Sequence, residues 1–148
     1  MNRFERQHIT RIIKEIEQKG EIPITKKAYY LYQKLGDIYQ YKSNYKYLNY
    51  NTEEEMQNKK KVYYEGTTEE GDGICKDINE TYVEALGMLG IEAHLSSFGK
   101  KFPHVDACFK DEIGNWYYTD LTADIMHIKT GMKIRNFGLS EKKIIEKG

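Results

Sequence analysis

The first forty residues alternate apolar and polar positions with the period of an α-helix. Over residues 4–19 the apolar side chains recur every three or four positions, and Gly20 ends the run. A second run follows Pro23 and extends from Thr25, the expected N-cap, to about Gln40. The two stripes consist of Phe4, Ile9, Ile12, Ile13 and Ile16, and of Ala28, Leu31, Tyr32, Leu35 and Ile38. We therefore expect two amphipathic helices in the N-terminal part.

A third helical pattern runs from Cys75 to Leu89, and Gly90 stands where a helix-terminating glycine is expected. The intervening residues 41–72 are polar, rich in tyrosine, and contain short runs of glutamate and lysine, which is typical of a solvated helix or loop. The apolar side of the third helix is formed by Cys75, Ile78, Tyr82, Ala85, Leu86 and Leu89.

After Gly90 the period of the pattern changes to two. Residues 91–98, 104–111 and 115–122 alternate apolar and polar positions and are separated by turn sequences, which predicts an antiparallel meander. A fourth short strand is expected at residues 125–129. Helices first and strands last predict an α+β domain, with the N-terminal helices and the cysteine-bearing helix packed on a small antiparallel sheet.

The length of 148 residues suits one domain with a hydrophobic core. We divide it into a helical N-terminal part (1–40), a polar connection (41–72), a core (73–124) and a C-terminal extension (125–148). The oligomeric state has no signature in the sequence.

The balance of charge argues against nucleic acid as a partner. The chain has 23 Lys and Arg and 23 Asp and Glu, so its formal net charge is zero. It contains no run of 18 apolar residues, and its N-terminus lacks the apolar core of a signal peptide. We expect no membrane partner and a cytoplasmic location, unless the chain is an excised domain of a secreted protein.

The two cysteines, Cys75 and Cys108, are too few for a disulfide framework. No His and Cys cluster has the spacing of zinc ligands, and we expect neither a metal nor another cofactor. A Cys75–Cys108 pair with a redox or structural role is the least favoured interpretation. Cys108 lies two pleats, or about 13 Å, along the expected strand from His104.

Three residues carry the chemistry that we consider. Cys75 opens a helix, whose unpaired N–H groups stabilise a thiolate. His104 opens a strand and can take the thiol proton, and Asp120, near the end of the next strand, can fix the histidine tautomer. The Cys75 amide can donate to an oxyanion, and Gly73 allows close approach of the backbone. Taken singly, the three are better explained as a core thiol, a turn or surface histidine and a turn cap.

The order of these residues resembles the core of the transglutaminase-like superfamily, within the papain-like cysteine-enzyme fold. That family has Gly-x-Cys at a helix start, a strand that begins with histidine, and a following Trp-Tyr-x-x-Asp strand. The resemblance covers about residues 70–124, and the matching pieces are Gly73 to Cys75, Leu86 to Ala93, His104, and Trp116 to Asp120.

This resemblance implies that Cys75 is the nucleophile, His104 the general base and acid, and Asp120 the orienting residue. It implies a thioester intermediate that is resolved by water or by an amine, with no metal in the chemistry, although some relatives use calcium for regulation. It also implies an oxyanion-binding side chain upstream of the cysteine, for which Tyr41 and Asn44 are both candidates.

One position departs from the family pattern. The family often has an aromatic residue two positions after the histidine, and this chain has Asp106. Strand alternation places Asp106 and Cys108 on the face of His104, with Val105, Ala107 and Phe109 on the other face. A carboxylate there could tune His104 or favour a basic substrate, and the simpler interpretation is a solvent-facing aspartate.

We expect a cysteine-dependent acyl-transfer enzyme that acts on an amide of a peptide or protein. Peptidase, glutamine deamidase and cross-linking transglutaminase share this machinery, and a small stand-alone domain of the bacterial type favours hydrolysis. The alternative is a non-catalytic protein-interaction domain with the same fold, whose contact surface would be the tyrosine-rich residues 39–50.

Overall fold

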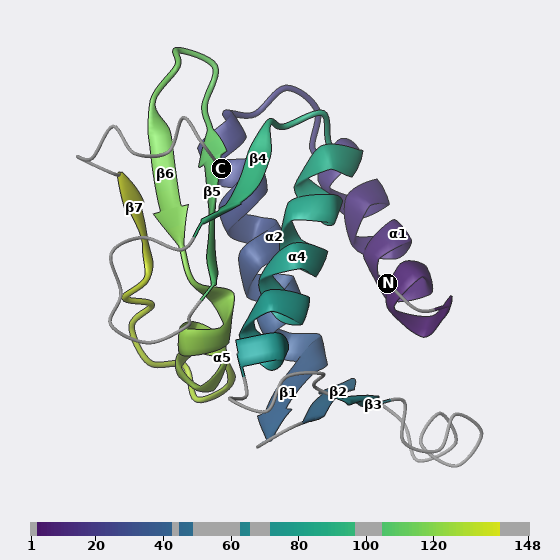
Figure 1. Ribbon diagram of the computed structural model, residues 1–148. Helices are drawn as coiled ribbons and strands as arrows, with labels where there is room; N and C mark the ends of the chain where they lie inside the picture. The colour runs from purple at the N-terminus through teal and green to yellow at the C-terminus, as the bar shows by residue number, and fades with distance from the viewer. Residues whose placement is uncertain (1–2, 43–44, 49–62, 66–71, 97–104, 140–148) are drawn as a thin grey trace.

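The computed structural model describes residues 3–42, 45–48, 63–65, 72–96 and 105–139 (Figure 1). The fold is α+β, as predicted. Within these residues the helices are α1 (Arg3–Glu17), α2 (Ile24–Ile38), α4 (Asp72–Met88) and α5 (Leu121–Lys129). One antiparallel sheet consists of β1 (Tyr39–Lys42), β2 (Tyr45–Leu48) and β3 (Tyr63–Glu65). The other consists of β4 (Ala93–Ser96), β5 (Asp106–Lys110), β6 (Trp116–Thr119) and β7 (Phe137–Leu139).

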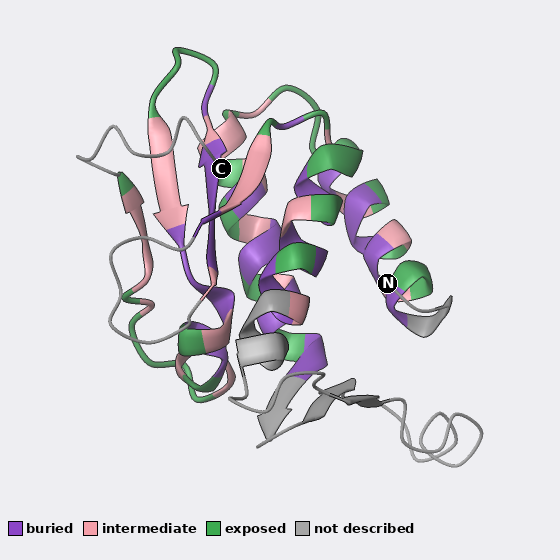
Figure 2. Ribbon diagram, viewed as in Figure 1, coloured by how far each residue is buried: buried purple, intermediate pink, exposed green. Residues whose placement is uncertain are grey.

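The main core lies between the helices and the four-stranded sheet. Helix α4 packs on β4 and β5, α2 packs beside α4, and α1 lies on the far side of these helices from the sheet (Figure 1). The apolar sides of the helices face inward, and buried positions follow them in Figure 2. Of the residues expected in the two N-terminal stripes, these are buried: Ile9, Ile12, Ile13, Ile16, Ala28, Leu31, Tyr32, Leu35 and Ile38.

The predicted antiparallel meander is confirmed, and its register is defined. Ala107 of β5 pairs with Leu95 of β4 and with Thr119 of β6. The hairpin between β5 and β6 is closed by Asp111, whose Oδ1 accepts hydrogen bonds from the N–H groups of Ile113 and Asn115 at 3.0 and 2.8 Å.

The predicted end of α4 is also confirmed. Gly90 has a φ of 76°, and the N–H of Ile91 donates to the carbonyl of Leu86 at 3.0 Å. A left-handed glycine at this position lets the chain leave the helix without a Cβ clash.

The strand expected at residues 125–129 is wrong. These residues belong to α5, which begins after Asp120 and buries Leu121, Asp124 and Ile125 on one side. The sequence of this short segment fits both the two-residue period of a strand and the 3.6-residue period of a helix. The burial at positions i, i+3 and i+4 is the pattern of a helix. The fourth strand is instead β7, which pairs with β6, and α5 crosses the division placed between residues 124 and 125.

Two further expectations differ from the structure. The N-cap of α2 is Pro23 rather than Thr25, because α2 begins at Ile24 and no side chain caps it. The connection at 41–72 contains parts of the sheet β1–β2–β3. Tyrosine is enriched in strands, so the sequence of Tyr45–Leu48 suits a strand although its composition is polar.

Candidate functional site

Cys75 lies in the first turn of α4, as the sequence predicted. The helix begins at Asp72, so that Asp72, Gly73 and Ile74 belong to the helix instead of preceding it. For Cys75 the structure describes the backbone. This position places the residue at the positive end of the helix dipole, which favours a negatively charged group.

Asp120 lies at the junction of β6 and α5. It is the N-cap of α5, and its Oδ1 accepts a hydrogen bond from the N–H of Ala123 at 3.4 Å. Its backbone N–H donates to the carbonyl of Asn136 at 3.0 Å. The residue is only 3% exposed, whereas a cap at the surface would be largely hydrated. The capping role is therefore present, and it leaves the carboxylate inside the fold.

Asn79 joins three elements through one fully buried side chain. It lies on α4, one turn after Cys75. Its Nδ2 donates to the carbonyl of Val105 at 2.8 Å, and its Oδ1 accepts from the N–H of Leu121 at 3.1 Å. Val105 directly follows His104, and Leu121 directly follows Asp120.

The same amide reaches two further oxygens. Nδ2 of Asn79 lies 3.4 Å from Oδ1 of Asp120 and 3.4 Å from Oγ1 of Thr122. Helix α4, the residue before β5 and the residue after β6 thus meet around Asn79, although 26 and 41 positions separate Asn79 from Val105 and Asp120.

The sequence reasoning missed Asn79, although a signal was present. Asn79 lies four residues after Cys75 and three before Tyr82, so it falls within the apolar stripe of the helix. A polar side chain at such a position is buried and requires hydrogen-bond partners from the elements that pack against it.

Two of the predicted site positions are not placed by the structure. His104 and Asn44 lie outside the described residues. Tyr41 lies in β1, where the backbone is described. The choice between Tyr41 and Asn44 for the oxyanion stays a prediction.

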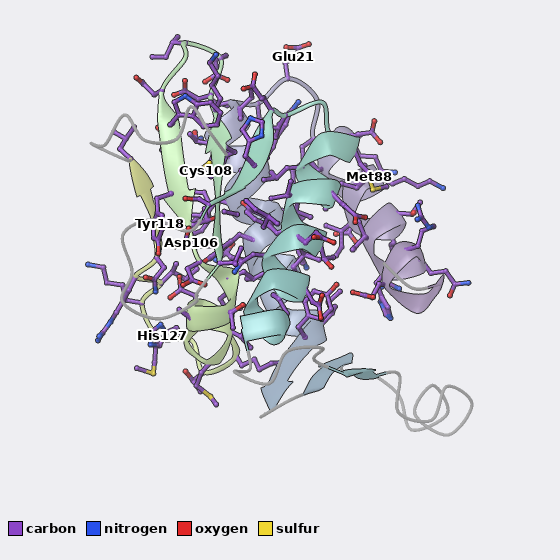
Figure 3. All side chains as sticks on the ribbon, in the orientation of Figure 1. Glu21, Met88, Asp106, Cys108, Tyr118 and His127 are labelled. Carbon is purple, nitrogen blue, oxygen red and sulfur yellow. The ribbon has the colours of Figure 1, made fainter. Side chains whose placement is uncertain are left out.

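Asp106 is fully buried, so the interpretation as a solvent-facing aspartate is wrong. It lies at the start of β5 and pairs with Ser96 of β4, which is itself buried. Ala107 and Phe109 point into the core, and Asp106 and Cys108 occupy the other face, as alternation predicted. Both faces of β5 are covered, and Figure 3 shows Asp106, Cys108 and Tyr118 along the middle of the sheet.

Cys108 is a free, buried thiol, which contradicts a Cys75–Cys108 disulfide. Its Sγ donates to the carbonyl of His94 at 3.6 Å. Burial raises the pKa of the thiol to about 11, so that it is protonated at neutral pH. Cys108 is therefore expected to react slowly with electrophiles.

Asp124 is a third buried carboxylate, one turn after Asp120 on α5, and the sequence reasoning did not predict it. Burial alone would raise its pKa, but hydrogen bonds outweigh burial and lower the pKa. They fix α5 against α2 and the segment before β7, and so fix the helix that Asp120 caps. The donors are Tyr32 Oη (2.7 Å), Asn136 N (2.8 Å), His127 Nδ1 (2.9 Å), Arg135 N (3.1 Å) and Asn136 Nδ2 (3.2 Å).

In the part of the chain that the structure describes, no three His, Cys, Asp or Glu side chains are grouped to hold a metal ion. Over those same residues, no helix has the length and apolar character needed to cross a bilayer. A comparison of the sequence and the fold with protein-family models, curated proteins and solved structures found no match.

Proposed function

We propose that the chain is a cysteine-dependent acyl-transfer enzyme that acts on an amide of a peptide or protein. Cys75 is the nucleophile, His104 the general base and acid, and Asp120 the residue that orients the histidine. One observation carries this proposal. The side chain of Asn79 ties the first part of α4 to the residue that follows His104 and to the residue that follows Asp120.

The dimensions of the backbone support a common site. Cys75 precedes Asn79 by four residues, which is about 6 Å along an α-helix. His104 directly precedes Val105 in the chain, and the carbonyl of Val105 accepts the Asn79 hydrogen bond at 2.8 Å. Asp120 is within 3.4 Å of the same amide. Asn79 thus brings α4, the residue after His104 and Asp120 together, and this supports a shared pocket for the nucleophile, the base and the orienting carboxylate.

The chemistry proceeds in two balanced halves. His104 takes the Cys75 proton, the thiolate attacks the carbonyl carbon, and the leaving amine departs with the proton from the imidazolium. The product of this half is a thioester on Cys75. His104 then removes a proton from water, the hydroxide attacks the thioester, and the thiol is regenerated together with a carboxylic acid. Asp120 keeps the imidazole in the tautomer whose unprotonated nitrogen faces the thiol.

The reactivity of Cys75 tests this proposal. In a Cys108→Ala background, we expect iodoacetamide to alkylate Cys75 at pH 6 at least tenfold faster than an ordinary thiol, whose pKa is about 8.5. His104→Ala and Asp120→Asn variants should lose most of that advantage, because the imidazolium that stabilises the thiolate is lost or misplaced. Mass spectrometry of the alkylated peptide gives the rates.

The result that would contradict the proposal is an ordinary thiol profile in the parent protein. A non-catalytic interaction domain predicts that profile, so the same measurement separates the two functions. The urea midpoints of the His104→Ala and Asp120→Asn variants serve as the control, because an unfolded variant would also show an ordinary profile.

A further inference from the structure

We propose that Asn79 is a positioning residue for the reaction, acting through Asp120. The inference rests on the proposed function and adds to it a residue outside the predicted triad. Asn79 holds the Asp120 carboxylate in one orientation and holds the residue that follows His104 beside it.

The orientation of the Asn79 amide is fixed by two backbone groups. Its Oδ1 accepts from the N–H of Leu121, and its Nδ2 donates to the carbonyl of Val105. Exchanging oxygen and nitrogen would place two donors together at Leu121 and two acceptors together at Val105. The second hydrogen of Nδ2 is therefore directed towards Asp120 and Thr122, whose oxygens both lie at 3.4 Å.

The second Nδ2 hydrogen of Asn79 restricts the rotation of the Asp120 carboxylate. The terminal torsion of aspartate has a broad energy minimum, so the carboxylate plane is set by its neighbours. Oδ1 of Asp120 is contacted by the Asn79 amide from α4 and by the Ala123 N–H from α5. With Oδ1 held from two elements, the direction in which Oδ2 points is determined as well. The ring orientation of a histidine that hydrogen-bonds to this carboxylate is then fixed as well.

Asparagine suits this position better than the other side chains that α4 would accommodate. The site is fully buried, and an amide supplies both the acceptor for Leu121 and the donors for Val105 and Asp120. An aspartate would place a second carboxylate within hydrogen-bond distance of Asp120 and opposite the Val105 carbonyl. Asparagine is also a weak helix former, so its place inside α4 costs helix stability.

The test compares Asn79→Ala and Asn79→Asp with Thr81→Val in the Cys108→Ala background. Thr81 is a matched control, because it is 3% exposed, lies on the same helix, and donates to the carbonyl of Asp77 at 2.9 Å. Alkylation of Cys75 is measured from pH 5 to 9 at a temperature where every variant is folded by circular dichroism. We expect both Asn79 variants to react at least tenfold more slowly at pH 6, with a profile displaced towards that of an ordinary thiol. Thr81→Val should lower the urea midpoint and keep the parent profile.

A measurement on the parent protein covers the case in which the Asn79 variants do not fold. The side-chain Nδ2 resonances of Asn79 should shift with pH at the same midpoint as the alkylation profile, because Asp120 links them to His104. The shift should disappear in His104→Ala.

The outcomes separate the two proposals. Folded Asn79 variants with the parent profile, or Asn79 resonances that do not change from pH 5 to 9, would overturn the positioning role and leave the proposed function standing. An ordinary thiol profile in the parent protein would overturn both.

Discussion

Replacing Asp124 by asparagine should lower the free energy of unfolding by about 2–6 kcal/mol. The carboxylate is fully buried and accepts five hydrogen bonds, from Tyr32, His127, Arg135 and the backbone and side chain of Asn136. An amide oxygen accepts about two hydrogen bonds, and the amide nitrogen would face donors. At least two donors then lose their partner, and each loss costs about 1–3 kcal/mol when the donor is buried.

Urea denaturation at pH 7 measures this effect. With a slope of about 2 kcal/mol per molar urea, the midpoint should fall by about 1–3 M at an unchanged slope. The matched control is Asp111→Asn, because Asp111 accepts from only two N–H groups, at Ile113 and Asn115, through one oxygen. An asparagine oxygen can accept both, so the control should lose less than about 1 kcal/mol. Equal losses in the two variants would refute the reasoning.

The pH dependence of stability gives a second check on Asp124. Its pKa in the fold is lowered from the ordinary value of 3.8, so the folded state binds this proton less readily than the unfolded state. The resulting stabilisation is complete above pH 3.8 and is lost as the pH falls through the lowered pKa. The parent protein should therefore lose more stability between pH 5 and pH 2 than Asp124→Asn does.

Two predictions concern glycines. Gly36→Ala should lower the free energy of unfolding by about 1–3 kcal/mol, because a Cβ there would overlap the side chain of Ile128 where α2 meets α5. In a double-mutant cycle, Ile128→Val should recover part of this loss. Gly90→Ala should cost about 1 kcal/mol because of its φ of 76°, whereas Gly87→Ala, within α4 and with open space at its Cβ, should gain about 0.5–1 kcal/mol. Thermal unfolding measures both pairs, and a Gly90→Ala variant as stable as the parent would contradict the second prediction.

The parts of the fold that the sequence predicted are those where one period dominates. The stripes of α1, α2 and α4 and the alternation of β5 are long enough, or apolar enough, to define one face. Where the pattern was short or polar, tertiary contacts determined the secondary structure. Residues 125–129 became helical because Leu121, Asp124 and Ile125 pack inward, and the β1–β2–β3 sheet formed from residues with few aliphatic side chains.

Burial of polar groups was the least predictable feature of the candidate site. Alternation gave the face on which Asp106 lies, but not its burial, because burial depends on what covers that face. The burial of Asp124 was equally unpredictable, because four of its five hydrogen bonds come from residues outside α5. Local spacing describes the face of an element and carries no information about the element that packs on it.

The two interpretations of Asp120 are compatible in physical terms. A cap requires that one carboxylate oxygen face the first turn of α5, and Oδ1 does so. An orienting residue requires that the carboxylate be buried and fixed in rotation, and the 3% exposure and the Asn79 amide meet both conditions. Because the cap uses Oδ1, it supplies part of the restraint that the orienting role needs. The capping role is thus no argument against catalysis, and the decisive quantity is the reactivity of Cys75.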